Sequence, residues 1–279
     1  MDIKDILLFL RAGAPCAAQT DLAMRLASEY GAQVTGLCLF SEPALRFADS
    51  YAIGSAAVGD VLADRDRVVR KLIEPIETAF RQAAAAHDCR VGWGITGPDE
   101  PMQLSALRAR FADLAIVRRP GPQDHAGRDL VATLARTSGT PCLVVPDKTR
   151  GAKTFDRIVL AWNGSREAKC ALDDSLGFVE RASTVKVLIV DGDTTSRVDE
   201  RWATALLEHL ARHGVSAELH RVGRSGEDIG DAILHSCEAF RADLLVMGAY
   251  GHPWGTESIL GGATRTVLSR ATIPVLMSH

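Results

Sequence analysis

The chain has 279 residues, of which 47% are hydrophobic and 24% are charged, and its formal net charge is −3. This composition is typical of a folded globular protein, and the length suits one large or two ordinary domains. The small net charge excludes a global field that attracts nucleic acid or anionic lipid, so we expect neither partner. No stretch approaches the roughly 18 apolar residues that cross a membrane. Residues 1–5 lack the basic start of a signal peptide, so we expect a cytoplasmic protein.

The first half of the chain alternates short apolar runs with longer amphipathic stretches, which is typical of β-α-β units around a parallel sheet. We expect strands at residues 6–10, 34–39, 90–93, 114–117 and 142–145. We expect helices near residues 15–30, 58–87, 102–111 and 129–137. Pro75 lies inside the longest of these helices and should kink or split it, because proline lacks a backbone donor.

The second half repeats the same order of elements. We expect its strands at residues 158–161, 185–190, 217–222, 244–247 and 275–277, and its helices near residues 167–181, 198–213, 226–240 and 259–270. Local echoes support a duplication, because residues 111–114 read Phe-Ala-Asp-Leu and residues 240–244 read Phe-Arg-Ala-Asp-Leu. The polar run at residues 146–153 is the natural linker.

The predicted fold is therefore α/β, with two tandem Rossmann-like domains at residues 1–147 and 154–279. Each domain is expected to contain a five-stranded parallel sheet flanked by helices. The halves differ at residues 41–60, which have no counterpart in the second half and form either a lid or a plain surface loop.

The polar side chains give little sign of catalysis or of a metal site. The six cysteines are scattered without a C-x-x-C motif, so reduced buried thiols are expected, with redox sensing as the alternative. His209 and His213 share a helix face, but no Glu follows His209 as a zinc protease helix requires. No catalytic triad can be assigned from spacing, so no catalytic residue and no metal ligand is named and an enzymatic role is disfavoured.

The segment with the most chemical character is residues 247–256, which follow an apolar strand and are rich in glycine. Glycine lets the main chain approach a ligand closely, and the helix that follows offers unpaired N–H groups at its start. A strand, a glycine loop and a helix start together indicate a phosphate cradle. The alternative is a glycine-rich turn that only allows the strand and the helix to pack closely.

At this point the chain resembles the universal stress protein family. The nucleotide-binding members of that family carry Gly-x2-Gly-x9-Gly, and Gly248, Gly251 and Gly261 have this spacing. Residues 156–165 resemble the opening strand and loop of the family, and residues 274–277 resemble its closing strand. The resemblance extends over the whole chain as two copies, the first with a degenerate loop. It implies a nucleotide site in the second copy.

The resemblance also implies which residues contact an adenine nucleotide: ATP, with ADP and AMP as alternatives and Mg as an accompanying ion. Those on the base and ribose side are Ala161, Trp162, Asn163 and Val190. Those around the ribose and phosphates are Met247, Gly248, Gly251, Gly261, Gly262, Ala263 and Thr264. Three residues depart from the family pattern: Asn163 replaces an acid, Gly262 replaces a Ser or Thr, and Trp162 replaces a smaller residue. The indole ring of Trp162 either stacks on the base or fills the pocket.

The loop after residues 114–117 lacks the glycine spacing and contains Arg118, Arg119 and Arg128. These arginines either attract an anion or form an exposed basic loop. Each half ends in a short apolar strand after Pro141 or Pro274, and family members pair such strands across a dimer. We expect the two final strands to pair within the chain as a pseudo-dimer, and a homodimer of the whole chain is also open.

These patterns lead to three functional hypotheses. The first is a nucleotide-responsive stress regulator with an ATP site in the second half. The second is a scaffold of the same fold that binds protein partners without nucleotide. The third, a slow ATPase, ranks last because no general base is identifiable. The sequence names neither the stress nor the protein partner.

Overall fold

The computed structural model describes residues 2–39, 55–97, 100–148, 155–191, 200–223, 226–249 and 262–279, and it describes residues 55–69 by their backbone alone. The elements of the N-terminal half are β1 (Asp5–Arg11), α1 (Ala17–Tyr30), β2 (Gln33–Leu39), α2 (Ser55–Ala86), β3 (Arg90–Ile95), α3 (Met102–Leu107) with a 3-10 turn (Arg108–Phe111), β4 (Leu114–Arg118), α4 (His125–Thr137) and β5 (Cys142–Val145).

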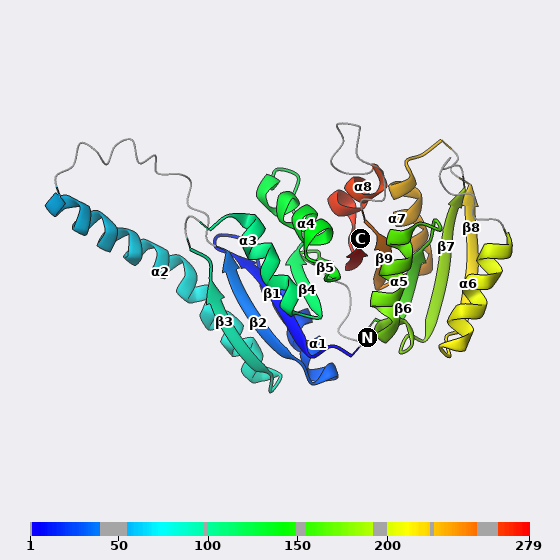
Figure 1. Cartoon of the computed structure of the whole chain (residues 1–279), viewed down its shortest axis with the longest axis horizontal. Helices are drawn as coiled ribbons and strands as arrows, with labels where there is room; N and C mark the ends of the chain where they lie inside the picture. Colours follow the sequence, from blue (N-terminus) through cyan, green and yellow to red (C-terminus); the bar gives the residue numbers. More distant parts are fainter. Residues whose placement is uncertain are drawn as a thin grey trace.

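The C-terminal half has the same succession of elements (Figure 1). They are β6 (Arg157–Ala161), α5 (Arg166–Val179), β7 (Thr184–Asp191), α6 (Glu200–Arg212), β8 (Ala217–Gly223), α7 (Ile229–Phe240), β9 (Leu244–Gly248), α8 (Gly262–Arg270) and β10 (Val275–Ser278). Every predicted strand and helix is present within a few residues, so the predicted α/β class is confirmed. Residues 40–54, which include most of the insertion, lie outside the described residues.

Pro75 does not split the long helix α2, which runs without a break from Ser55 to Ala86. The side chain of Pro75 is exposed, so the carbonyl of Lys71 that loses its donor faces water and needs no protein partner. Ile73 and Phe80, on the other face of the helix, are buried in the core and keep the two parts of the helix against the sheet. Packing therefore outweighs the cost of the proline.

All ten strands form one sheet in the order β3-β2-β1-β4-β5-β10-β9-β6-β7-β8. Neighbouring strands are parallel within each half. The two final strands, β5 and β10, pair with each other in the antiparallel direction, with Leu143 opposite Leu276. The expected pairing of the final strands within the chain is thus observed, and it joins the halves edge to edge.

Helices cover both faces of the sheet, and each layer contains residues from both halves. One buried cluster packs α1, α2, α5 and α6 on the sheet, and a second packs α3, α4, α7 and α8 on the opposite face. On the first face the hydroxyl of Tyr30 in α1 donates to the carbonyl of Gly177 in α5 at 2.9 Å. The ring of Tyr30 also meets Phe178 edge-on, with centroids 5.8 Å apart. The halves therefore share a core.

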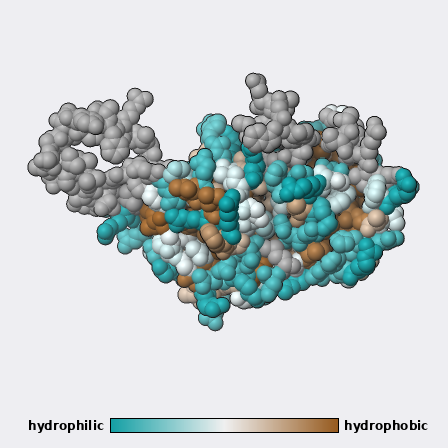
Figure 2. Space-filling model, in the orientation of Figure 1, coloured by the Kyte–Doolittle hydropathy of each residue, from teal (hydrophilic) through white to brown (hydrophobic). Residues whose placement is uncertain are grey.

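The visible surface in Figure 2 is mainly hydrophilic, with hydrophobic areas scattered over it. Large exposed hydrophobic side chains include Phe111 at 87% and Trp202 at 67%, and isolated ones of this kind are normal on protein surfaces. Among the helices of the described residues, none has both the length and the apolar character needed to cross a membrane.

Candidate functional site

Each half of the sheet has a point where the strand order reverses. In the C-terminal half, β6 lies between β7 on one side and β9 on the other. Ligands of open α/β sheets bind outside the carboxyl ends of the strands at such a switch point. The carboxyl ends of β6 and β9, together with the starts of α5 and α8, therefore define the candidate site.

Three of the predicted site residues lie together at this edge. Ala161 at the end of β6 is in register with Met247 of β9, and Val190 lies near the end of β7, which is the next strand. All three belong to the cluster on the α7 and α8 face, where Val190 and Met247 are buried and Ala161 is half-buried. They form an apolar surface at this edge of the sheet.

Trp162 does not join this group, contrary to the expectation that it lines the base and ribose side. Its side chain packs against Ile189 and Ala203 on the α5 and α6 face. Successive side chains of an extended strand point to opposite faces, so Trp162 is directed away from Ala161. It fills the core beneath α6.

Asn163 lies in the turn between β6 and α5, where its side chain is exposed. Its Oδ1 accepts a hydrogen bond from the backbone N–H of Ser165 at 3.1 Å. Ser165 in turn caps α5 by accepting from the N–H of Ala168 at 3.1 Å. The Asn163 carbonyl oxygen therefore organises the start of α5.

Gly248 ends β9 directly against the start of α5. A Cβ at this position would lie 2.6 Å from both the backbone nitrogen of Ala168 and the carbonyl carbon of Glu167. Only glycine allows the strand and the helix to approach so closely. The packing interpretation of the glycine segment therefore accounts for Gly248 by itself.

The start of α8 presents its residues unequally. Gly262 is exposed, Ala263 is half-buried, and Thr264 is only 4% exposed. Thr264 lies on the face of α8 that also buries Val267, so its side chain is packed against the core, and its expected contact with phosphate stays a prediction. Residues 250–261, with Gly251 and Gly261, lie outside the described residues.

Asp228 is a residue of the site that the sequence interpretation missed. It caps α7, where its Oδ1 accepts from the N–H of Gly230 at 2.8 Å. Its Oδ2 is the nearest atom, at 3.6 Å, to the place where a Cβ on Gly262 would lie. A carboxylate thus lies beside the start of α8. The expected helix near residues 226–240 includes Asp228, and an aspartate near a helix start is the N-cap signal that could have found it.

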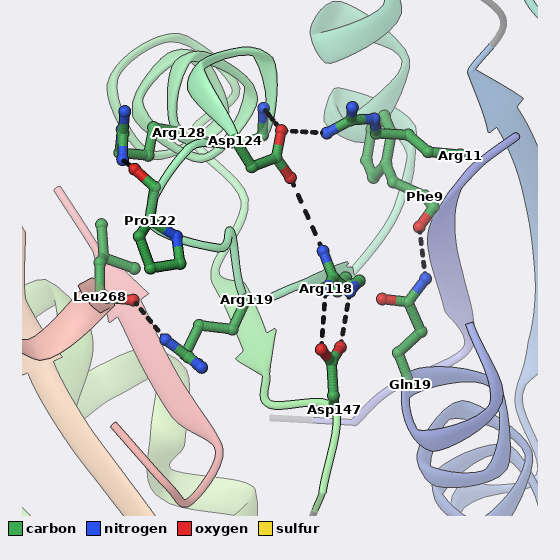
Figure 3. A network of polar contacts seen from close by, with 11 residues as sticks. Phe9, Arg11, Gln19, Arg118, Arg119, Pro122, Asp124, Arg128, Asp147 and Leu268 are labelled. Atoms are coloured by element: carbon green, nitrogen blue, oxygen red, sulfur yellow. Dashed lines mark hydrogen bonds and ion pairs between the residues drawn. The ribbon is translucent and has the colours of Figure 1, made fainter. Parts of the chain in front are cut away.

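The switch point of the N-terminal half, between β1 and β4, contains a network of ion pairs (Figure 3). Arg118 binds Asp147 through two hydrogen bonds of 2.5 and 2.7 Å, and Arg128 donates to the carbonyl of Pro122 at 2.7 Å. Arg118 and Arg119 are half-buried. The expectation of an exposed basic loop is therefore wrong, because partners from the same chain hold these side chains.

Arg119 joins the N-terminal half to the far end of α8. Its Nη1 donates to the carbonyl of Ser269 at 2.6 Å, in the last turn of the helix. A cation at a helix C-terminus stabilises the helix through the macrodipole. The first half therefore contacts the helix whose start belongs to the candidate site.

We expect the Arg119→Ala substitution to lower the free energy of unfolding by about 1 kcal/mol and to speed hydrogen exchange in α8, since the last carbonyls of the helix lose their donor. Hydrogen exchange followed by mass spectrometry measures this. Arg110→Ala is the matched control, because Arg110 binds the carbonyl of Thr137 at the end of α4 at 2.9 Å. The Arg110→Ala variant should leave exchange in α8 unchanged. If Arg119→Ala leaves it unchanged as well, the hydrogen bond from Arg119 to Ser269 does not stabilise α8.

The histidines and cysteines noted in the sequence lie apart from the two switch points or act singly among the described residues. That part of the chain contains no group of three or more His, Cys, Asp or Glu placed to hold a metal ion. The His209 and His213 rings lie 4.8 Å apart, and His213 pairs with Glu180 at 3.3 Å. All six cysteines are free, and burial raises the pKa of Cys142 and of Cys237 to about 12, which makes these two thiols unreactive.

Comparison with known proteins gives a consistent result for the C-terminal half. The model of the universal stress protein family matches residues 154–279. A universal stress protein of Synechocystis sp. strain PCC 6803 is 27% identical over 179 residues. That match includes 62% of this chain and 60% of the relative, so the chain spans less than two thirds of the relative's length.

Two solved structures match over both halves. A universal stress protein from Archaeoglobus fulgidus has a TM-score of 0.69 at 15% identity, covering 98% of this chain and 95% of that one. A functionally unknown protein from Pseudomonas aeruginosa has a TM-score of 0.60 at 15% identity, covering 99% of this chain and 92% of that one. At this identity the matches show the fold alone.

Proposed function

The chain belongs to the universal stress protein family through residues 154–279, and on that premise we propose that it is a stress-response regulator whose C-terminal half binds an adenine nucleotide. The proposal includes two tandem domains, at residues 1–147 and 154–279, acting in the cytoplasm. The observation that carries it is the switch point between β6 and β9, where strand ends and helix starts meet.

The described residues of this edge fit the parts of a nucleotide. Val190 and Met247 offer an apolar surface for a base, and the exposed start of α8 at Gly262 offers N–H groups for phosphate. The neighbouring carboxylate of Asp228 would repel a phosphate without a counterion, and a Mg²⁺ ion bound between the two anions would offset this repulsion. ATP with Mg²⁺ is therefore the nucleotide we propose.

The test is a titration of the purified chain with ATP, ADP and AMP by calorimetry, after any carried nucleotide has been released and identified by chromatography. We expect saturable binding of ATP, and a loss of about tenfold or more in affinity for Gly261→Asp, because the new charge would oppose the phosphates.

Gly121→Asp is the matched control. It adds the same charge to the corresponding loop of the N-terminal half, where a Cβ meets no atom within 4 Å. If Gly261→Asp binds ATP as tightly as the unmodified chain does, the assigned site is wrong.

A scaffold that works without nucleotide is the second candidate, and one observation favours it. Gly248 is explained by the packing of β9 on α5 with no ligand. On this proposal the purified chain releases no nucleotide, shows no heat of binding, and recognises a protein partner. Light scattering would show in either case whether the whole chain forms a homodimer.

A further inference from the structure

The centre of the network in the N-terminal half is the carboxylate of Asp124 (Figure 3). Arg11, at the end of β1, donates from Nη1 to its Oδ1, and Nη1 of Arg118, at the end of β4, lies 3.7 Å from its Oδ2. Arg118 also holds Asp147 just after β5. Side chains from β1 and β4 thus converge on one carboxylate at the switch point.

The position of this network corresponds to the candidate site in the other half. The two halves have the same register, which pairs Ile6 with Leu114 and Ile158 with Leu244. Along these strands Arg11 stands where the second half has Asn163, and Arg118 stands where it has Gly248. Two cations therefore replace two residues of the proposed nucleotide site.

Asp124 occupies the start of α4 as a bound anion would. Its Oδ1 accepts from the N–H of Gly127 at 2.9 Å, and unpaired N–H groups at a helix start are the usual place for a phosphate or carboxylate. A Cβ on Gly127 would lie only 2.5 Å from Oδ2 and 2.8 Å from Cγ of Asp124. Glycine at position 127 therefore leaves room for the carboxylate to rest on the backbone.

The surroundings keep this carboxylate charged. Burial alone would raise the pKa of Asp124, but the hydrogen bonds from Arg11 and Gly127 and the charges of Arg11 and Arg118 hold it below its ordinary value. The group is an anion at neutral pH.

The space left around the network is small, and polar and apolar side chains line it together. Arg11, Gln19, Arg118 and Asp124 line a cavity of about 20 Å³, and Gln19 and Arg118 also line one of about 40 Å³. A water needs roughly 10–15 Å³ on this measure, so these cavities are large enough for water and too small for a nucleotide. Gln19 is 3% exposed, and its Oε1 has no hydrogen-bond partner among the described residues. Figure 3 shows this oxygen directed toward Arg118.

We propose that the N-terminal half contains an oxyanion site at its switch point and that the chain's own Asp124 carboxylate fills it in place of a phosphate. The two arginines and the start of α4 bind this internal ligand, and Gln19 lines the small cavity beside it. The N-terminal half is thereby held in a ligand-bound arrangement without any ligand. Removal of the carboxylate opens the site to inorganic phosphate.

The test is the Asp124→Ser variant with inorganic phosphate as the probe. Serine still caps a helix start, but it is uncharged and too short to reach the arginines. We expect phosphate to bind this variant in calorimetry. We also expect phosphate to raise the midpoint of thermal unfolding by about 5 °C more than it does in the unmodified chain.

Two further variants show whether the gain comes from this site. Adding Arg118→Gln to Asp124→Ser should remove the gain, because a cation that binds the phosphate is lost. Asp147→Ser, the matched control, frees Arg118 from one partner but leaves Asp124 in place, so it should gain nothing. All variants share the C-terminal half, so the outcome does not depend on its nucleotide site.

One result overturns the proposal. The Asp124→Ser variant is folded, as its circular dichroism shows, and phosphate affects it no more than it affects the unmodified chain. If the variant is unfolded without phosphate, the proposal requires phosphate to restore the dichroism of the folded protein. Failure of that rescue overturns it equally.

Discussion

Replacement of Leu276 by alanine is expected to lower the free energy of unfolding by about 2–5 kcal/mol. Leu276 is 0% exposed and lies in β10, between Leu143 of β5 and Val246 of β9. The substitution leaves a cavity at the seam where the two halves meet, in a core cluster with residues from both. Neighbours on a continuous sheet cannot move in to fill it without breaking strand pairs, so we expect the cost to fall in the upper part of that range.

Urea unfolding followed by circular dichroism measures this change. The matched control is Leu104→Ala, because Leu104 in α3 is 53% exposed and its loss should alter stability by no more than about 0.5 kcal/mol. Equal stability of the two variants would mean that the β5–β10 seam contributes little to holding the halves together.

Gly248→Ala is expected to cost about 1–3 kcal/mol of stability in the absence of ligand. The new methyl group would lie 2.6 Å from backbone atoms of Glu167 and Ala168, which cannot turn aside as a flexible side chain can. The start of α5 and the end of β9 must then move apart. Thermal and urea unfolding of the nucleotide-free protein measure the loss.

Gly262→Ala is the matched control in the same segment. A Cβ there has its nearest contact at 3.6 Å, to Oδ2 of Asp228, which is an ordinary distance. Alanine in the first turn of α8 should leave stability unchanged or raise it by up to about 1 kcal/mol, because it restricts the unfolded chain. If Gly248→Ala is as stable as Gly262→Ala, close packing is not the reason for glycine at position 248.

The sequence by itself determined the succession of elements and its repetition in the same order. Apolar runs of strand length alternate with helical patterns twice in the same order, and hydrophobic burial on both faces of a sheet requires such a pattern. The echo of residues 111–114 at residues 240–244 predicted two similar halves, and the structure shows the same strand order in both. Local signals of this kind depend only on neighbouring residues, so they can be read without the fold.

Only the tertiary structure decided which residues face one another across the switch points. Strand alternation places the half-buried Trp162 against Ile189 and Ala203, on the other face of the sheet from Ala161, and helix packing buries Thr264. Arg11 and Asp124 are 113 positions apart in the chain, and no local pattern joins them. Strand register, the sheet face that a side chain occupies and the close approach of β9 to α5 all depend on how the elements pack together. This packing places the Asp124 carboxylate in the proposed oxyanion site of the N-terminal half and leaves the C-terminal half as the candidate for nucleotide binding.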